Sequence, residues 1–111
     1  MKSYTDKEQS KKLAEILPIE SADMWYDRCG TPSFIDKYVT HESIKSNKYH
    51  DIIPCWSLAS LIGVLPKYEI HGNGKTITLD VNLEALETEG DETLLDLVVN
   101  MIIHLHEQNL L

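Results

Sequence analysis

The chain has 111 residues, the length of one domain, and we treat residues 1–111 as a single domain. Ten lysine and arginine residues against eighteen aspartate and glutamate residues give a net charge of −8, and residues 76–111, which contain no lysine or arginine, carry all of it. This charge excludes a general nucleic-acid binder and a polybasic membrane anchor, because both need a basic surface. The 42% hydrophobic composition is that of a globular domain.

The start of the chain and the two cysteines indicate a cytoplasmic protein. Residues 1–8 are polar where a signal peptide would need an apolar stretch, and no apolar run exceeds three residues. Cys29 and Cys55 form no CxxC motif; they could pair, but two reduced thiols are the simpler interpretation.

The first predicted element is a helix over about residues 5–17. Thr5 and Glu8 have the spacing of a capping box, and Pro18 ends the apolar stripe that follows. Residues 18–54 are the least regular part of the chain, and within them residues 24–26 are predicted as a short strand at the edge of a sheet.

A second helix is predicted over residues 56–65. Ser57 is a candidate N-cap, and Pro66 stops the helix. Gly63 costs about 1 kcal/mol relative to alanine inside a helix, which a close crossing by another element would explain. The apolar positions follow helical spacing: Leu58, Leu61, Ile62 and Leu65.

A β-hairpin follows, with strands 67–71 and 75–82. Asn73 and Gly74 favour a two-residue type I′ turn, so that residues whose numbers sum to 147 lie opposite each other. Ile70 is then opposite Ile77, and the second strand has one apolar face and one polar face.

The last predicted helix, residues 93–108, is apolar around most of its girth. Thr93 and Asp96 have capping-box spacing, with Asp91 as the rival cap. Such a helix is central in its fold or contributes to a subunit interface. The expected fold class is α+β, with a small antiparallel sheet packed against three helices.

We expect no catalytic, cofactor-binding or metal-binding residue, since no pattern of such a site is present. His104 and His106 are two positions apart on a helix, point in different directions and cannot share a metal ion. His71 is expected near the end of the hairpin, and the chain has no G-x-S-x-G motif.

Three groups of residues are candidates for binding a protein partner. Trp25 and Tyr26 are aromatic anchors if exposed, although packing in the core is the favoured interpretation. The acidic loop after the hairpin either keeps the protein soluble or fits a partner's basic groove, as DNA-mimicking inhibitors do. The acidic and last-helix candidates are Glu84, Glu87, Glu89, Leu95, Val99 and Ile103.

Segment 53–62, IPCWSLASLI, resembles the I-P-C/A-W-S-L-x-x-L-L signature of small prophage and mobile-element proteins from gut Bacteroidetes and other bacteria. Residues 21–24, 65–66 and 101–108 match further pieces of that pattern in order. The chain departs from it at His104 and in the acidic loop. The resemblance implies a setting among accessory genes of phages and integrated elements and supplies no catalytic residue.

Two functions follow as hypotheses. The first is a non-enzymatic accessory protein that binds a protein partner or a second copy of itself through the last helix. The alternative is a small enzyme or ligand-binding domain with a site in residues 23–56, which requires Asp27, His41, His50 or Asp51 to converge in a pocket.

Overall fold

The computed structural model describes residues 2–27, 29–36, 39–46 and 52–111 and confirms the α+β class. Within these residues the α-helices are α1 (Lys7–Ala14), α2 (His41–Lys45), α3 (Leu58–Val64) and α4 (Leu94–Glu107), with a 3-10 turn at Ile19–Ser21. One antiparallel sheet contains β1 (Met24–Tyr26), β2 (Pro32–Phe34) and β3 (Ile53–Cys55). The other contains β4 (Tyr68–Asn73), β5 (Thr76–Val81) and β6 (Glu84–Glu87). No helix in these ranges is long and apolar enough to cross a membrane.

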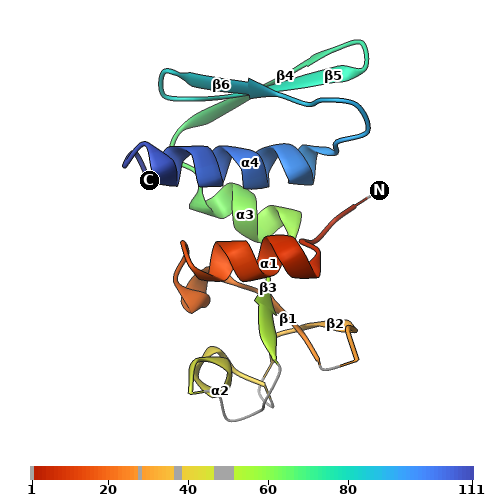
Figure 1. Ribbon diagram of the computed structural model, residues 1–111, viewed down its shortest axis with the longest axis vertical. Helices are drawn as coiled ribbons and strands as arrows, with labels where there is room; N and C mark the ends of the chain where they lie inside the picture. The colour runs from red at the N-terminus through yellow and green to blue at the C-terminus, as the bar shows by residue number, and fades with distance from the viewer. Residues whose placement is uncertain (1, 28, 37–38, 47–51) are drawn as a thin grey trace.

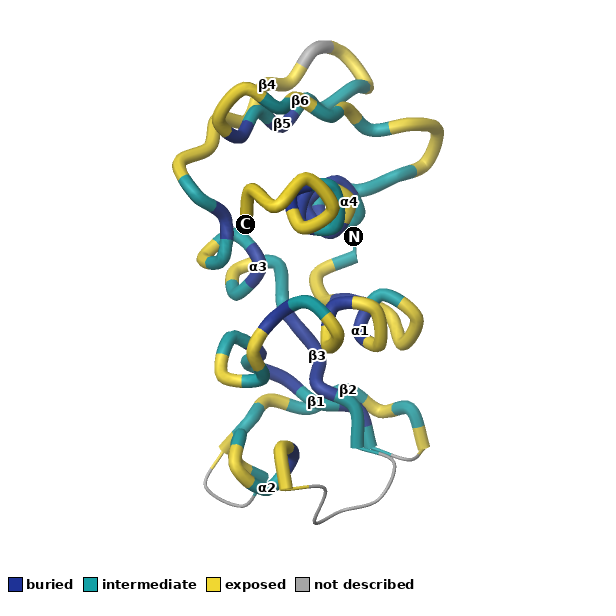
Figure 2. The backbone as a smooth tube through the Cα atoms, turned by 60° about the vertical axis from the view of Figure 1, so that its left-hand side comes forward, coloured by how far each residue is buried: buried dark blue, intermediate teal, exposed yellow. Residues whose placement is uncertain are grey.

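Helix α4 lies at the centre of the fold, which explains its apolar girth. The β4–β5–β6 sheet covers one side of it, and α3 and α1 pack against it from the other (Figure 1). Leu95 and Val99 are each only 1% exposed and belong to the main core. Their assignment to a partner surface is therefore corrected, because neighbouring elements of the same chain already bury both side chains. Figure 2 shows α4 end-on between the β4–β5–β6 sheet and the other helices, with buried positions in dark blue.

Helix α1 begins two residues later than predicted, because its capping box differs. Asp6 accepts a hydrogen bond from the Gln9 amide at 2.8 Å, and the Gln9 side chain accepts one from the Asp6 amide at 3.1 Å. Thr5, the predicted cap, is buried instead. Its hydroxyl accepts a hydrogen bond from the Trp56 amide at 3.1 Å and is bonded to Ser10 at 2.7 Å, so it ties the start of the chain to the segment before α3.

Strand 24–26 forms, but as the central strand of a second sheet rather than at the edge of the hairpin sheet. Met24 pairs with Phe34 of β2 on one side and with Cys55 of β3 on the other. Strand β2 lies within residues 18–54, the region predicted to be irregular, and β3 begins in it and ends one residue beyond it. Strands of three residues carry too little alternation to be recognised in a sequence, so the pairing alone reveals them.

Helix α3 confirms the second predicted helix, and Ser57 is its N-cap, accepting a hydrogen bond from the Ser60 amide at 3.2 Å. The explanation offered for Gly63 is wrong. A Cβ atom placed at Gly63 would meet no atom within 4 Å, so no element crosses the helix closely there.

The hairpin forms with its register shifted by two residues. The numbers of directly opposed residues sum to 149 instead of 147, so Ile70 lies opposite Leu79. The two residues of the loop are Gly74 and Lys75. Only Gly74 of these two has a positive φ, +65°, whereas a type I′ turn needs positive φ at both positions. Because the shift is even, the apolar and polar faces of β5 remain as predicted.

The predicted acidic loop contains a further strand, β6, which pairs with β5. Leu79 lies opposite Leu86, and Val81 lies opposite Glu84. Asn82, with φ +57°, makes the tight turn between the two strands. The sheet order β4–β5–β6 therefore leaves β6 at an edge.

Candidate functional site

The β4–β5–β6 sheet has two chemically different faces. The inner face packs on α4 with Leu79, Val81 and Leu86. The outer face is not covered by any element in the described part of the chain (Figure 1). Because neighbouring residues of a strand point to opposite faces, the pairing places these residues, among others, on the outer face: Glu69, His71, Thr76, Thr78, Asp80, Ala85 and Glu87.

Three of these outer-face side chains converge. His71 Nε2 lies 3.4 Å from Glu69 Oε2 and 3.2 Å from Asp80 Oδ2. Glu69 and Asp80 are directly opposed across the strands, and His71 is the next outward residue along β4. The side chains of Glu69, His71 and Asp80 are 70%, 56% and 37% exposed, so solutes reach all three.

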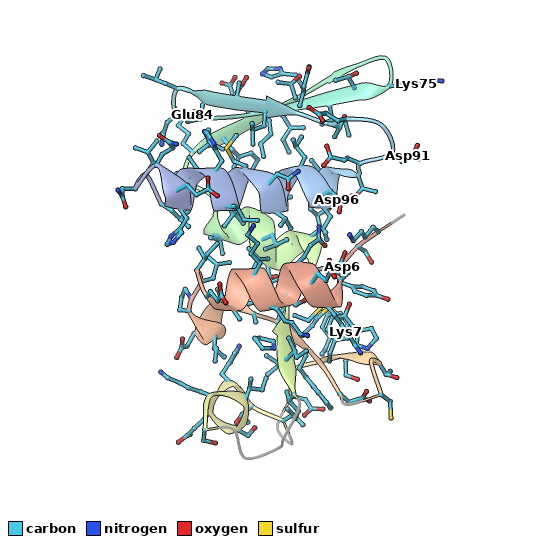
Figure 3. The ribbon with its side chains drawn as sticks, viewed as in Figure 1. Asp6, Lys7, Lys75, Glu84, Asp91 and Asp96 are labelled. Carbon is cyan, nitrogen blue, oxygen red and sulfur yellow. The ribbon has the colours of Figure 1, made fainter. Side chains whose placement is uncertain are left out.

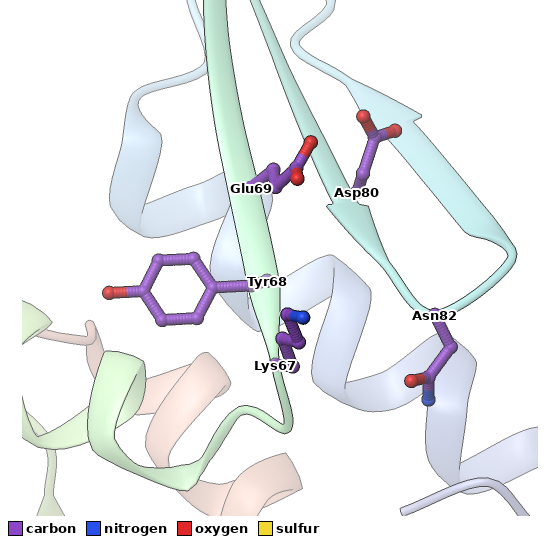
Figure 4. Close-up of a pocket in the computed structure, with 5 residues that line it drawn as sticks. All are labelled: Lys67, Tyr68, Glu69, Asp80 and Asn82. Atoms are coloured by element: carbon purple, nitrogen blue, oxygen red, sulfur yellow. The ribbon is translucent and has the colours of Figure 1, made fainter.

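A shallow pocket of about 290 Å³ adjoins this cluster. Its lining residues come from the position before β4, from the start of β4, from β5 and from the turn after β5: Lys67, Tyr68, Glu69, Asp80 and Asn82. Figure 4 shows the carboxylates of Glu69 and Asp80 projecting from adjacent strands. The pocket therefore lies over the β4–β5 hairpin and the turn that leads into β6.

The predicted acidic residues divide into two kinds. Glu84 lies on the inner side of β6, and its carboxylate is bonded to His104 Nε2 of α4 at 2.8 Å, which joins the sheet edge to the helix (Figure 3). Glu87 and Glu89 are exposed, and no ion pair of either occurs among the described residues. We call Glu87, Glu89 and the exposed Asp91 the acidic edge.

The predicted aromatic anchors make hydrogen bonds within the chain and are buried or half-buried. Tyr26 is buried and donates a hydrogen bond to the Thr5 carbonyl at 2.5 Å; burial raises the pKa of its phenol. Trp25 is half-buried and donates to the Phe34 carbonyl at 3.3 Å. Ile103 is also half-buried and lies beside Leu86 in a surface depression.

The alternative site in residues 23–56 is only partly described. Asp27 accepts hydrogen bonds from the backbone amides of Cys29 and Thr31 at 2.8 and 2.9 Å and so orders a turn. His41 is bonded to a different backbone group, the Ala22 carbonyl, at 2.5 Å. The structure therefore gives Asp27 and His41 separate local roles.

His50 and Asp51, the other two candidates in that region, lie outside the described residues.

An apolar groove of about 590 Å³ is lined in part by residues of that region and in part by the start of α3. Phe34 at its rim is 66% exposed, and Asp23 within it is bonded to the Ser57 amide at 2.9 Å and to the Ser57 hydroxyl at 2.5 Å. The remaining lining residues are Ser3, Leu58, Ala59 and Ile62. The one carboxylate here is thus already occupied by the cap of α3.

A charged network joins the N-terminal ends of α1 and α4. Lys2 Nζ lies 2.7 Å from Asp96 and 3.1 Å from Asp6, and the Gln9 amide group donates to Asp96 at 2.9 Å (Figure 3). Partial burial would raise the Asp96 pKa, but the hydrogen bonds from Lys2, Thr93 and Gln9 outweigh it and hold the pKa well below 3.8. Every member bonds another, so this cluster has a structural role.

The two cysteines are free thiols in different surroundings. Cys29 is exposed, whereas Cys55 is fully buried. Burial raises the pKa of the Cys55 thiol, and the hydrogen bond that the Thr5 hydroxyl donates to its sulfur at 3.6 Å only partly opposes that effect. The thiol itself donates to the Thr5 carbonyl at 3.5 Å. A thiol held protonated in this way is a poor nucleophile.

Comparison of this chain with protein-family models, with curated proteins and with solved structures gives no match.

The Glu69–His71–Asp80 cluster is the feature that sequence reasoning missed. Under the predicted register, Asp80 would lie opposite Lys67, and the cluster would not form. The observed register places Asp80 opposite Glu69. The E-x-H spacing on β4 was the available signal, because residues i and i+2 of a strand share a face.

Proposed function

We propose that this chain is a non-enzymatic binding protein whose acidic edge receives a basic, extended segment of a partner protein. The observation that supports this is the free edge of β6. In the described part of the chain no strand pairs with the outer side of β6, and Glu87, Glu89 and Asp91 are exposed along and after it. An unpaired edge offers backbone amides and carbonyls to an added strand, and the side chains select it.

Charge determines which occupant the edge favours. Residues 76–111 contain no lysine or arginine, so a lysine- or arginine-rich segment finds carboxylates with little competing positive charge. A second copy of the chain would oppose glutamate to glutamate, which is unfavourable. Acidic residues also discourage edge-to-edge aggregation, so the same charges protect the free protein.

The cellular setting is part of the same proposal. We infer a cytoplasmic accessory protein of a phage or integrated element, from the resemblance of segment 53–62 and from the two free thiols, Cys29 and Cys55. In that setting the partner is a host or phage protein with a basic surface segment.

Charge reversal tests the proposal. Glu87→Lys/Glu89→Lys should lose the partners that the wild-type chain retains from a bacterial lysate, and with a purified partner it should raise the Kd by at least about tenfold. Glu8→Lys/Glu15→Lys is the matched control, since it makes the same change in net charge at exposed positions of the N-terminal region. Binding by the wild type should weaken as salt increases.

Two results would refute this assignment. One is a partner whose affinity is the same for wild type and for Glu87→Lys/Glu89→Lys. The other is a partner lost on Phe34→Ser but kept by the charge reversal, which would move the binding surface to the apolar groove.

A further inference from the structure

Glu69, His71 and Asp80 form a cluster on the outer face of the sheet that the proposed partner binding does not use. Together they offer one imidazole nitrogen and two carboxylate oxygens, and these three atoms lie within 4.8 Å of one another. The set comes from two adjacent strands of one hairpin, so the ladder of β4 and β5 fixes its backbone positions.

The distances fit a tetrahedral metal ion. Bonds of about 2.0–2.2 Å to zinc place two ligand atoms about 3.3–3.6 Å apart. His71 Nε2 already lies 3.4 Å from Glu69 Oε2 and 3.2 Å from Asp80 Oδ2. The two carboxylate oxygens lie within 4.8 Å of each other, a gap that the length of the 70% exposed Glu69 side chain would allow it to close on binding a metal ion.

A bound cation would also reduce the electrostatic repulsion between the two carboxylates of the cluster. Glu69 and Asp80 are directly opposed, and like charges at opposed positions destabilise a strand pair. Among the described residues, the ion pairs of these two carboxylates are with His71, which is positive only when protonated. Lys67 lines the adjoining pocket, but it lies beyond ion-pair distance of both carboxylates.

We propose that Glu69, His71 and Asp80 bind one zinc ion, with water in the fourth position. An imidazole with two carboxylates suits zinc, whereas magnesium and calcium prefer oxygen ligands alone. The ion clamps β4 to β5 and offsets the repulsion between Glu69 and Asp80. This site is independent of the acidic edge, because Glu87 and Glu89 are not among its ligands.

Calorimetric titration of the chelator-treated full chain with zinc chloride tests the site. The wild type should bind one zinc per chain, with a rise in Tm as zinc is added. His71→Ala and Asp80→Asn should each weaken binding by at least about tenfold, because each removes a direct ligand. The His71 side chain is 56% exposed and the Asp80 side chain 37% exposed. Because neither residue is part of the core, both variants should melt near the wild-type Tm when zinc is absent.

Three control variants distinguish zinc binding at this site from zinc binding at other exposed side chains. Glu87→Gln removes a carboxylate from the same outer face, His106→Gln removes an exposed histidine, and Cys29→Ser removes the exposed thiol. Each should leave zinc affinity within about twofold of wild type. Absence of saturable binding overturns the proposal, as does zinc binding that survives His71→Ala or is lost on Cys29→Ser.

Discussion

Asp96 provides the sharpest test of how the two helix N-termini are held together. Its carboxylate accepts hydrogen bonds from Lys2 at 2.7 Å, from Gln9 at 2.9 Å, and from the Thr93 amide and hydroxyl at 3.0 and 3.1 Å. Replacing it by alanine removes the capping box of α4, leaves the Gln9 side-chain amide without its acceptor and leaves Lys2 paired with Asp6 alone.

The expected cost of Asp96→Ala is about 2.5 kcal/mol. Loss of a helix-capping interaction costs about 1 kcal/mol, and hydrogen bonds to a charged group contribute about 1.5–3 kcal/mol net. The carboxylate is only 19% exposed, so water compensates little for the loss. For a domain of this size that free energy lowers Tm by roughly 10 °C. Asp96→Asn keeps an acceptor and should cost about half as much.

Urea denaturation followed by circular dichroism measures these changes as shifts in midpoint at constant m-value. Asp91→Asn is the matched control: an exposed acid just before the same helix, expected to change stability by less than about 0.5 kcal/mol. In a double-mutant cycle, Lys2→Met and Asp96→Asn together should cost less than the sum of the single changes by about 1 kcal/mol.

The effect of Asp96→Asn should also depend on pH. Because the folded-state pKa of Asp96 lies below its ordinary 3.8, the ionised carboxylate stabilises the fold fully above pH 3.8 and progressively less as the pH falls below that value. Additive effects in the cycle, or a difference from wild type that is unchanged in acid, would refute the assignment of this network.

Three further predictions concern single residues. Gly63→Ala should raise the free energy of unfolding by about 0.5–1 kcal/mol in urea titrations, because a Cβ there meets no atom within 4 Å; a loss of stability would contradict this. Val99→Asp should abolish the folded circular dichroism spectrum, since it places a charge where the side chain is 1% exposed; a folded, soluble variant would mean that Val99 is not in the core. A thiol reagent should modify exposed Cys29 in the native protein and buried Cys55 only after unfolding, and mass spectrometry showing fast labelling at Cys55 would disprove its burial.

Local signals were sufficient for the elements that depend on a few neighbouring residues. The caps of α3 and α4, Ser57 and Thr93, lie where the sequence predicts them, because each cap interaction spans three residues. The apolar face of β5 is also as predicted, since strand alternation depends only on the strand's own residues.

Interactions between distant segments decided the rest. Thr5 and Asp6 are both good caps, and burial of Thr5 against Trp56 left Asp6 to begin α1. The turn at Gly74 had two registers with the same face pattern, and only pairing across the strands distinguishes them.

The net charge of −8 is also determined partly by the sequence alone and partly, in its effects, by the tertiary structure. The sequence determines that the charge lies in residues 76–111 and that a basic surface is absent there. Tertiary structure assigns Glu84 to His104 and Asp96 to Lys2, and leaves Glu87 and Glu89 exposed. The reason is physical: a carboxylate's role depends on what lies within a few ångströms of it, and those neighbours come from other parts of the chain.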